Sequence, residues 1–373
     1  MRIALNAHLL SGTAGYRSAG IHRYIDQLLK HLPAALPEDW RLTAFTGAQS
    51  TAEYAGIDLR RSRRNTDSAA RRIVWEQAAQ PWQLRGFDAY HALAFVGPLL
   101  GAPPSVVTVY DLSFIHTPER LPASRRLYLR WLTALTCRRA RRVIGISQST
   151  ARDVVATFGI PAERVDVAAP GVDSARFFRL PQAEIEAFRR ARSLPPRFWL
   201  FMGTLEPRKN LVTLIEAYAA LPESQRLPLV IAGGKGWEFA PIFDAVERHQ
   251  LQDAIQFPGF VPFDELALWY NSAETFIYPS VFEGFGLPVL EAMACGVPVI
   301  VSDASSLPEI AANAGLCLPP LAVGAWTEAL RRAVGDDEWR RSAADAGLRE
   351  ASRFTWNETA RQTAAAYQRA FYG

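Results

Sequence analysis

The sequence predicts an α/β protein that is built from two domains, each with a parallel β-sheet. Short apolar segments rich in strand formers alternate with amphipathic helical segments along the whole chain, which is typical of sheets whose strands are joined by helices. Several of these strands end in glycine-rich or polar turns. At 373 residues, with 49% hydrophobic and 21% charged residues, the chain is long enough for two domains with separate cores.

Composition favours a cytoplasmic protein. No apolar segment reaches the roughly 18 residues that a membrane-spanning helix requires. The N-terminus leads directly into a strand and lacks the layout of a signal peptide. The three cysteines, Cys137, Cys295 and Cys317, lie in apolar surroundings without the spacing of a metal site, as expected of structural thiols in a reducing compartment.

Positive charge is concentrated in the first half of the chain. Residues 1–173 carry 22 Arg and Lys against 14 Asp and Glu, whereas the whole chain has a net charge of +4. Arginines cluster at 60–64, 71–72 and 138–142, and Trp75 and Trp82 lie close to the second cluster. Such a surface would attract anionic lipid, an anionic acceptor or nucleic acid, and an ordinary solvated surface is an equally good explanation.

In the first half, strands are expected at 2–7, 42–46, 87–91, 105–111, 143–147 and 165–169, and helices at 21–32, 73–84 and 127–142. Residues 47–72 are polar and basic and predict a long surface segment. The glycine-rich turn at 11–20, with Gly15 and Gly20, would bring bare backbone close to a ligand, although its spacing is not that of a dinucleotide fingerprint.

Polar side chains follow two of these strands. Tyr110 and Asp111 end the strand at 105–111, and His91 ends the strand at 87–91. Ligands gather at the carboxyl ends of strands in open α/β sheets, so these residues and His116 are candidates for a site. Asp111 is the strongest of them, because a lone histidine is more often structural.

In the second half, strands are expected at 198–203, 229–233, 255–257, 275–278 and 297–301, and helices at 182–193, 211–221, 263–271, 290–295 and 354–372. Arg208 and Lys209 follow the first of these strands and precede a helix. Their charge and the positive end of the helix dipole together favour a phosphate group at this turn.

Residues 275–301 read as strand, glycine turn, helix, glycine stop and strand. Pro288 suits the first turn of the helix, and Gly296 stands where a glycine ends one. Two carboxylates, Glu283 and Glu291, flank the amide groups of the helix N-terminus. This arrangement of a hydroxyl-binding acid, an anion site and a second acid matches the sugar, diphosphate and ribose of a sugar nucleotide.

These segments together resemble the retaining GT-B glycosyltransferases of the group-one type, also called family four. The resemblance extends over nearly the whole chain and is most specific in the second half. The matching segments are MGTLEPRKN at 202–210, FPGFV at 257–261, YPSVFEGFGLP at 278–288 and EA at 291–292, with APGVD at 169–173 and FTW at 354–356.

The resemblance implies two Rossmann-like domains that face a cleft. Residues 1–173, with a C-terminal helix at about 355–373 that crosses back to them, would bind the acceptor, and residues 174–354 would bind the sugar nucleotide. Glu283 would hold the hydroxyls of the transferred sugar, Arg208 and Lys209 the diphosphate, and Glu291 the ribose. The remaining donor-binding positions would be Gly203, Phe260, Val261, Gly284, Phe285, Gly286 and Leu287, with Gly15 and Gly20 from the first domain.

Two positions depart from the pattern of the family. Relatives commonly carry His-Asp where this chain has Tyr110-Asp111, so Tyr110 or Asp111 is expected to act beside the reacting sugar. Some relatives carry Arg where this chain has Thr204, which leaves Arg208 and Lys209 as the main cationic clamp. No Asp-x-Asp metal motif is present, so we expect this clamp to replace a metal and no cofactor to be required.

The expected reaction is transfer of a sugar, with mannose as the first choice, from a GDP- or UDP-sugar to a glycan, lipid or small-molecule acceptor. Peripheral contact with an anionic membrane through the basic first half is a further expectation, and nucleic acid is not an expected partner. Two alternatives stay open at this point. One is a GT-B epimerase or phosphorylase, and the other is a basic protein that binds a membrane or nucleic acid.

Overall fold

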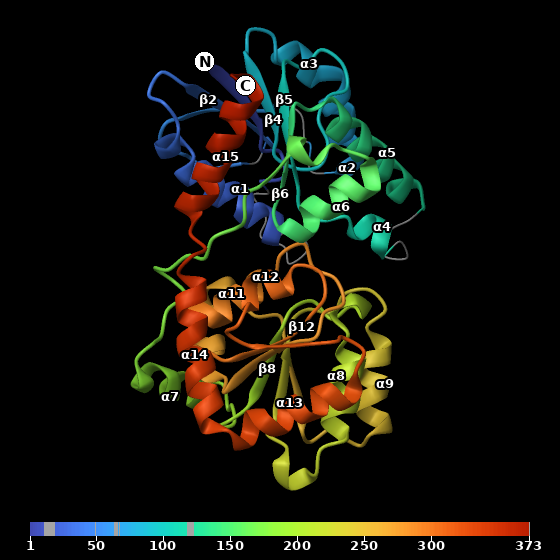
Figure 1. Ribbon diagram of the computed structural model, residues 1–373, viewed down its shortest axis with the longest axis vertical. Helices are drawn as coiled ribbons and strands as arrows, with labels where there is room; N and C mark the ends of the chain where they lie inside the picture. The colour runs from blue at the N-terminus through green and yellow to red at the C-terminus, as the bar shows by residue number, and fades with distance from the viewer. Residues whose placement is uncertain (11–18, 49, 63–65, 67, 118–122, 373) are drawn as a thin grey trace. The chain divides into compact units, whose positions relative to one another are not determined.

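The computed structural model describes residues 1–373 except 11–18, 49, 63–65, 67, 118–122 and 373. The chain divides into two compact units, each with its own parallel sheet (Figure 1). Unit 1 consists of Met1–Gly171 and Thr355–Gly373, and unit 2 consists of Val172–Phe354. The second unit is therefore one continuous segment inserted before the last helix.

The sheet of unit 1 has seven parallel strands in the order β3-β2-β1-β4-β5-β6-β7. Its central strands are buried on both faces, as expected where helices cover a parallel sheet on both sides. The strands are β1 (Arg2–Asn6), β2 (Arg41–Thr46), β3 (Ile57–Arg61), β4 (Ala89–Ala92), β5 (Ser105–Val109), β6 (Arg142–Gly145) and β7 (Val165–Val167).

The helices of unit 1 lie on both faces of this sheet (Figure 1). They are α1 (Ala19–His31), α2 (Ala69–Val74), α3 (Gln80–Gln83), α4 (Ser113–His116), α5 (Ala123–Arg139), α6 (Gln148–Phe158) and α15 (Trp356–Phe371), with a π-helix at Trp75–Ala79 and 3-10 turns at Pro33–Ala35 and Ala162–Arg164. Capping explains several of the ends: the Ser147 side chain accepts a hydrogen bond from the Thr150 amide at the start of α6.

The structure corrects two predictions in this unit. The polar segment 47–72 contains the edge strand β3 and the start of α2. Only Ile57 of β3 is buried, and Arg60 and Arg61 follow on this edge, so the strand lacks the apolar pattern by which others are found. The single helix expected at 73–84 is instead divided into α2, the π-helix and α3, because Pro81 has no N–H with which to continue an α-helix.

The last helix, α15, belongs to unit 1 and packs beside α1 over β5 and β6. Its Tyr367 is fully buried, and the Tyr367 hydroxyl lies 2.6 Å from Nδ1 of His91 on β4. Side chains of neighbouring strand residues point to opposite faces. Tyr90 and Ala92 accordingly pack in the cluster on the α5 side of the sheet. The C-terminal segment is thus an integral part of the first core.

The sheet of unit 2 has six parallel strands in the order β10-β9-β8-β11-β12-β13. The strands are β8 (Trp199–Met202), β9 (Leu229–Ala232), β10 (Ile255–Gly259), β11 (Thr275–Tyr278), β12 (Val299–Ser302) and β13 (Leu316–Leu318). The helices are α7 (Gln182–Ala191), α8 (Leu211–Ala219), α9 (Ala240–Arg248), α10 (Leu266–Ser272), α11 (Leu287–Ala294), α12 (Leu307–Ala311), α13 (Val323–Gly335) and α14 (Asp337–Ala351), with 3-10 turns at Pro207–Lys209, Glu223–Gln225 and Phe263–Glu265.

Each sheet has a point at which the order of its strands reverses direction. In unit 1 this switch point lies between β1 and β4, and in unit 2 it lies between β8 and β11. The loops that follow the two central strands then run to opposite sides, which opens a crevice at the carboxyl edge of the sheet. Ligands of open α/β sheets bind at this place.

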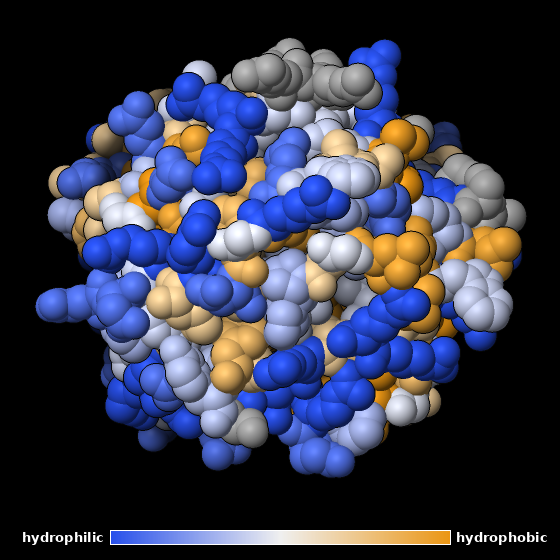
Figure 2. All heavy atoms as spheres, turned by 90° about the horizontal axis from the view of Figure 1, so that it is seen from above, coloured by the Kyte–Doolittle hydropathy of each residue, from blue (hydrophilic) through white to orange (hydrophobic). Residues whose placement is uncertain are grey.

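None of the helices in the described part of the chain combines the length and the apolar character needed to cross a bilayer. On the face in Figure 2, hydrophobic side chains are scattered among hydrophilic ones. Exposed large apolar residues do occur in unit 1, among them Trp82 and Trp131, which are 64% and 65% exposed.

Candidate active site

The loops after β8 and β11 form the candidate site of unit 2. The loop after β11 leads through Gly286 into α11, where Pro288 is the second residue. Gly286 has φ of +126°, and a Cβ atom there would come within 2.8 Å of the Leu307 side chain, so both conformation and packing require glycine. At its other end α11 is followed by Gly296 with φ of +72°, as the sequence predicts.

A buried ion cluster joins the two loops. Lys209 Nζ lies 2.5 Å from Oε1 of Glu283, and Arg208 Nη1 lies 2.8 Å from Oε2 of the same carboxylate. The Arg208 Nε atom also lies 2.5 Å from Oε1 of Glu206. Glu206, Lys209 and Glu283 are 4%, 5% and 8% exposed. The cluster therefore brings together Arg208, Lys209 and Glu283 at the switch point of the sheet. The sequence predicts the first two for donor binding and the third for contact with the sugar.

The two cations keep Glu283 ionised. Burial opposes its ionisation, but Arg208 and Lys209 outweigh burial and lower the pKa of Glu283 to about 2. Burial, and then the charge of Arg208, lower the pKa of Lys209 to about 8 even though Glu283 favours its charged form. Burial also acts against the charge of Arg208, but Glu283 and Glu206 raise its pKa above the ordinary value. At neutral pH the cluster contains an ionised carboxylate between two cations.

Side chains that the sequence analysis did not single out hold this cluster. The Tyr278 hydroxyl at the end of β11 accepts a hydrogen bond of 2.5 Å from Lys209. The Ser306 hydroxyl donates to the Glu283 carbonyl over 3.0 Å, and the Glu283 amide donates to the Ser305 hydroxyl over 3.2 Å. Tyr278 lies within a predicted strand, and its polar position at the strand end was the available signal. The serines follow β12, in a segment for which no element was predicted.

The second predicted glutamate, Glu291, lies within α11. It is 3% exposed, and its Oε2 accepts a hydrogen bond of 2.9 Å from the Tyr270 hydroxyl on α10. Between the two glutamates lie Gly284, Phe285, Gly286 and Leu287, the last of which is the first residue of α11. Phe285 is buried and packs against Phe354 with ring centroids 5.7 Å apart. The structure thus places this segment at a helix N-terminus, as expected.

Further along the same sheet, Phe260 and Val261 follow β10. Phe260 is 61% exposed, whereas Val261 is buried. They border a hollow of about 490 Å³ that Trp269 and the ion pair of Arg192 with Glu265 also line. Gly203, which follows β8, donates its amide to the Ala232 carbonyl over 2.9 Å and packs beside the aliphatic part of Lys209.

The two catalytic candidates of unit 1, Tyr110 and Asp111, differ in burial and in their contacts. The Tyr110 hydroxyl donates to the Leu93 carbonyl over 2.8 Å and is buried between Tyr24 and Phe95. Burial raises the pKa of Tyr110 well above its usual value. Asp111 is partly exposed, and its Oδ1 accepts a hydrogen bond of 2.9 Å from the Ser113 amide. The contacts of Tyr110 are those of a core residue, so Asp111 is the better placed of the two for chemistry.

The other candidates of unit 1 have structural contacts or lie outside the described residues. His91 is fully buried between Tyr367 and Thr108, and burial lowers its pKa to about 3. His116 Nε2 lies 3.1 Å from Asp153. Gly20 is the second residue of α1, and Gly15 lies outside the described residues. No group of three or more His, Cys, Asp or Glu side chains within the described ranges could hold a metal ion.

Comparison with known proteins supports the family suggested by these features. Residues 183–350 match the model of "Glycosyl transferases group 1", and residues 18–176 match that of "Glycosyltransferase Family 4". A relative from Escherichia coli, "O-antigen chain mannosyltransferase B", is 32% identical over 372 residues, which are 95% of this chain and 97% of the relative. The chain belongs to the group 1 glycosyltransferases. This glycosyltransferase is a retaining, nucleotide-sugar-dependent enzyme of family four.

Solved structures show that the fold is GT-B. Sucrose-phosphate synthase from Thermosynechococcus elongatus superposes with a TM-score of 0.77 at 21% identity, covering 100% of this chain and 99% of the other. HepE from Anabaena, solved with UDP and glucose, gives a TM-score of 0.75 at 18% identity, covering 99% of both chains. The predicted pair of parallel sheets and the C-terminal helix that returns to the first unit are thus confirmed.

Proposed function

We propose that this glycosyltransferase transfers mannose from a nucleotide-diphosphate mannose to a glycan acceptor during assembly of a polysaccharide. The observation that carries the proposal is the ionised Glu283 between Arg208 and Lys209, at the switch point of the sheet of unit 2. An ionised carboxylate beside two cations can bind the hydroxyls of a sugar and its diphosphate side by side.

The proposed roles in unit 2 follow the order of groups along a sugar nucleotide. Arg208 and Lys209 bind the diphosphate and stabilise the charge that it gains as the leaving group. Glu283 accepts hydrogen bonds from hydroxyls of the transferred sugar, and Glu291 accepts them from the ribose. The remaining positions contact the donor through backbone or apolar groups; they are Gly203, Phe260, Val261, Gly284, Phe285, Gly286 and Leu287, with Gly15 and Gly20 from unit 1.

In the proposed reaction the bond between the sugar C1 atom and the leaving phosphate oxygen breaks, and a bond from the acceptor oxygen to C1 forms on the same face. The acceptor hydroxyl gives its proton to the leaving phosphate. No enzymic nucleophile is required, and Asp111, or Tyr110 if its hydroxyl is released from Leu93, acts beside the reacting sugar. Fixed cations are effective here because they need no reorganisation when charge develops.

The choice of mannose is supported by the name of the relative, "O-antigen chain mannosyltransferase B", at 32% identity over nearly the whole of both chains. Either a GDP- or a UDP-sugar fits the proposal. The test is a panel of GDP- and UDP-sugars with the purified chain, measuring thermal stabilisation and release of nucleoside diphosphate. GDP-mannose is expected to give the largest effect. Release of no nucleoside diphosphate from any sugar nucleotide would refute the proposed function.

We also propose that transfer needs no metal ion, because Arg208 and Lys209 already supply two positive charges where the diphosphate would lie. Treatment with a chelator is expected to leave the rate of transfer unchanged. A loss of rate that added Mg²⁺ or Mn²⁺ restores would contradict metal independence without affecting the assignment of the donor.

A place at the inner face of a membrane is the remaining part of the proposal. All three cysteines are free thiols, as expected in the cytoplasm, and the exposed Trp82 and Trp131 lie among arginines, with Arg85 stacked 4.0 Å from the Trp82 ring. Arginine and tryptophan together suit an anionic lipid surface. The protein is expected to float with vesicles only when they contain anionic lipid. Flotation that is independent of lipid charge, or no flotation at all, would contradict the proposed membrane contact.

A further inference from the structure

Unit 1 has a cavity at the switch point of its own sheet. Asn6 ends β1 and Leu9 follows it, while Ala94, Phe95 and Val96 follow β4. These are the two strands between which the strand order reverses. The cavity therefore lies where open α/β sheets bind their ligands. Of its lining, only Arg72 was singled out by the sequence, as part of a basic cluster that would attract an anionic group.

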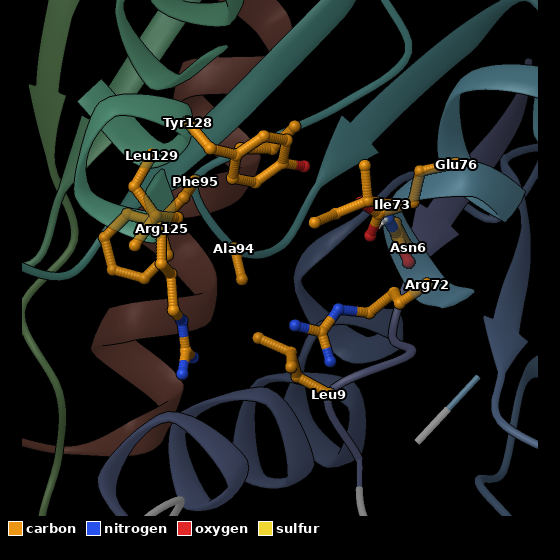
Figure 3. A pocket seen from close by; sticks show the side chains of 11 residues that line it. Asn6, Leu9, Arg72, Ile73, Glu76, Ala94, Phe95, Arg125, Tyr128 and Leu129 are labelled. Carbon is orange, nitrogen blue, oxygen red and sulfur yellow. Dashed lines mark hydrogen bonds between the residues drawn. The ribbon is translucent and has the colours of Figure 1, made fainter. Parts of the chain in front are cut away.

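Two guanidinium groups extend into this cavity from different elements. Arg72 comes from α2 and Arg125 from α5, and Figure 3 shows both side chains pointing into the space beside Ala94 and Leu9. Arg72 is partly buried and Arg125 is exposed. In the described part of the chain, neither Arg72 nor Arg125 has an ion pair with a carboxylate.

A buried acid, Glu76, lines the cavity one turn after Arg72 and interacts with the charge of that arginine. Glu76 is 6% exposed, and its Oε1 accepts a hydrogen bond of 3.1 Å from Asn6 Nδ2. Burial raises the pKa of Glu76 to about 7, although Arg72 and Asn6 act in the opposite direction. The raised pKa favours the protonated form of Glu76, and a protonated carboxyl can donate a hydrogen bond to an anion.

A hydroxyl of the lining also lacks a partner. The Tyr128 hydroxyl oxygen is shielded from solvent and makes no hydrogen bond to any of the residues that the structure describes. Buried hydroxyls are ordinarily hydrogen-bonded, so this oxygen is available to a group that enters the cavity. Tyr128 stands on α5 one turn after Arg125, and Figure 3 shows its ring beside Phe95 and Leu129.

The size of the cavity limits what it can hold. Its volume is about 70 Å³, which accommodates a few water-sized groups and is far below the several hundred Å³ of a site that encloses a whole ligand. A single phosphate or carboxylate fits this volume. The apolar lining formed by Phe95, Ile73 and Leu129 then suits the ring or chain to which that group is attached.

We propose that this cavity is an acceptor subsite, in which Arg72 and Arg125 bind a phosphate or carboxylate carried by the acceptor glycan and Tyr128 donates a hydrogen bond to it. The inference rests on the proposed function, since it identifies the class of acceptor that the enzyme takes. An anionic group would pair with both guanidinium groups and give the shielded Tyr128 hydroxyl a partner, whereas a neutral oligosaccharide would leave the two arginines unpaired.

The test measures binding to the full chain with the nucleoside diphosphate present at saturation, so that the Arg208 and Lys209 cluster is occupied. The probes are mannose 1-phosphate, methyl glucuronoside and, as the neutral reference, methyl mannoside, measured by calorimetry. One of the two anionic probes is expected to bind at least about tenfold more tightly than the neutral one. A stronger response to mannose 1-phosphate identifies a phosphate, and a stronger response to the glucuronoside identifies a carboxylate.

Variants then locate the binding. Arg72→Gln and Arg125→Gln are each expected to weaken the preferred anionic probe roughly tenfold. Arg130→Gln is the matched control, because Arg130 is an exposed arginine on α5, as Arg125 is, but does not line the cavity. The Arg130→Gln variant should bind the probe as tightly as the unaltered chain does. Equal affinity for all three probes, or anion binding that survives both substitutions, would overturn the proposal.

Two measurements separate this inference from the proposed function. Binding of mannose 1-phosphate that disappears when nucleoside diphosphate is added would place the anion at the donor cluster and overturn the acceptor subsite alone. Release of nucleoside diphosphate from a sugar nucleotide by the unaltered chain tests the proposed function and needs no acceptor. With an acceptor that carries the anionic group, Arg125→Gln is expected to raise its KM roughly tenfold while kcat changes less than threefold.

Discussion

The Lys209 ammonium lies 2.5 Å from a carboxylate oxygen of Glu283, 74 residues further along the chain and on the neighbouring loop. The cation proposed for the diphosphate is thus paired with the acid proposed for the sugar. A bound sugar nucleotide would add contacts to both residues at once. Substitution of either residue is therefore expected to affect the other, and the effects of the two will not add.

Glu283→Gln is expected to lower the kcat of transfer at least about 100-fold, because the neutral amide cannot balance the two cations around the sugar. The affinity for nucleoside diphosphate should change less than about fivefold, since the substitution frees Arg208 and Lys209 for the phosphates. Initial rates with GDP-mannose and calorimetry with GDP measure the two quantities.

Glu223→Gln serves as the control for that experiment, because Glu223 is an exposed glutamate of the same unit. It should leave both quantities unchanged. A Glu283→Gln variant that turns over at the normal rate would refute the role of Glu283. The variant should first be shown to be folded by circular dichroism, since removal of one partner from a buried ion cluster can cost about 3–5 kcal/mol of stability.

Lys209→Met is expected to weaken binding of nucleoside diphosphate at least about tenfold, which corresponds to loss of one charge-assisted contact of about 1.5 kcal/mol or more. Methionine keeps most of the length of the side chain and removes its charge. Calorimetry of the variant against the unaltered chain measures the loss, with the exposed Lys30→Met as the control. Equal affinities in all three proteins would count against a phosphate clamp.

The same lysine predicts a pH dependence. Burial and Arg208 lower the pKa of Lys209 to about 8, so its charge is present below pH 8 and is progressively lost above it. Affinity for nucleoside diphosphate should consequently fall between pH 8 and pH 10 in the unaltered chain. In Lys209→Met the affinity should be low and nearly constant over this interval. A parallel decline in both proteins would assign the dependence to another group.

Glu76 links folding stability to pH in the opposite sense to an ordinary paired acid. Burial raises its pKa from 4.5 to about 7, so the folded state holds this proton more tightly than the unfolded state. The stabilisation is complete below pH 4.5 and is lost as pH rises to about 7. Arg72, Asn6, Tyr90 and Tyr128 are the polar groups that interact with it.

Glu76→Gln, which stays neutral, should therefore gain stability relative to the unaltered chain as pH rises from 4.5 to 7, by a total of about 3 kcal/mol. Urea unfolding followed by tryptophan fluorescence at several pH values measures this difference. The exposed Glu53→Gln is the control and should show a constant offset. A difference between Glu76→Gln and the unaltered chain that is independent of pH would contradict the linkage.

Tyr367→Phe tests whether α15 is part of the core of unit 1. The substitution removes the hydroxyl that lies 2.6 Å from His91 and leaves a buried ring nitrogen without a partner, at an expected cost of about 1–3 kcal/mol. Thermal unfolding should show the loss. Tyr372→Phe, at a tyrosine that is 68% exposed and next to the same helix, should change stability by less than about 0.5 kcal/mol. Equal stability of both variants would contradict the assignment.

Local signals in the sequence were sufficient for much of unit 2. Pro288 and Gly296 fix the two ends of α11, and the apolar runs before Gly203 and Pro279 correspond to β8 and β11. These features depend on the conformational limits of single residues or on short periodic patterns, which sequence alone contains. For the same reason Arg208 and Lys209 could be placed at the end of a strand.

Features that depend on contacts between distant segments could not be predicted from the sequence. The edge strand β3 buries a single residue, so its place is set by pairing with β2 and not by its own pattern. The cavity of unit 1 gathers Asn6, Arg72, Phe95 and Arg125 from four separate segments, and no spacing connects them. The hydrogen bond from the Tyr110 hydroxyl to the Leu93 carbonyl likewise depends on packing between strands. The position of Tyr110 in the sequence does not indicate this contact.

The chain crosses between its two units twice, and the crossings lie side by side. The Val172 amide donates to the Phe354 carbonyl over 3.0 Å, and a Cβ on Gly171 would lie 2.2 Å from the Trp356 nitrogen, so the outgoing and returning segments touch. Residues 172–354 thus have adjacent ends. On the proposed assignment of the nucleotide sugar to unit 2 and the acceptor to unit 1, recombination at these two junctions would let the two specificities be inherited separately.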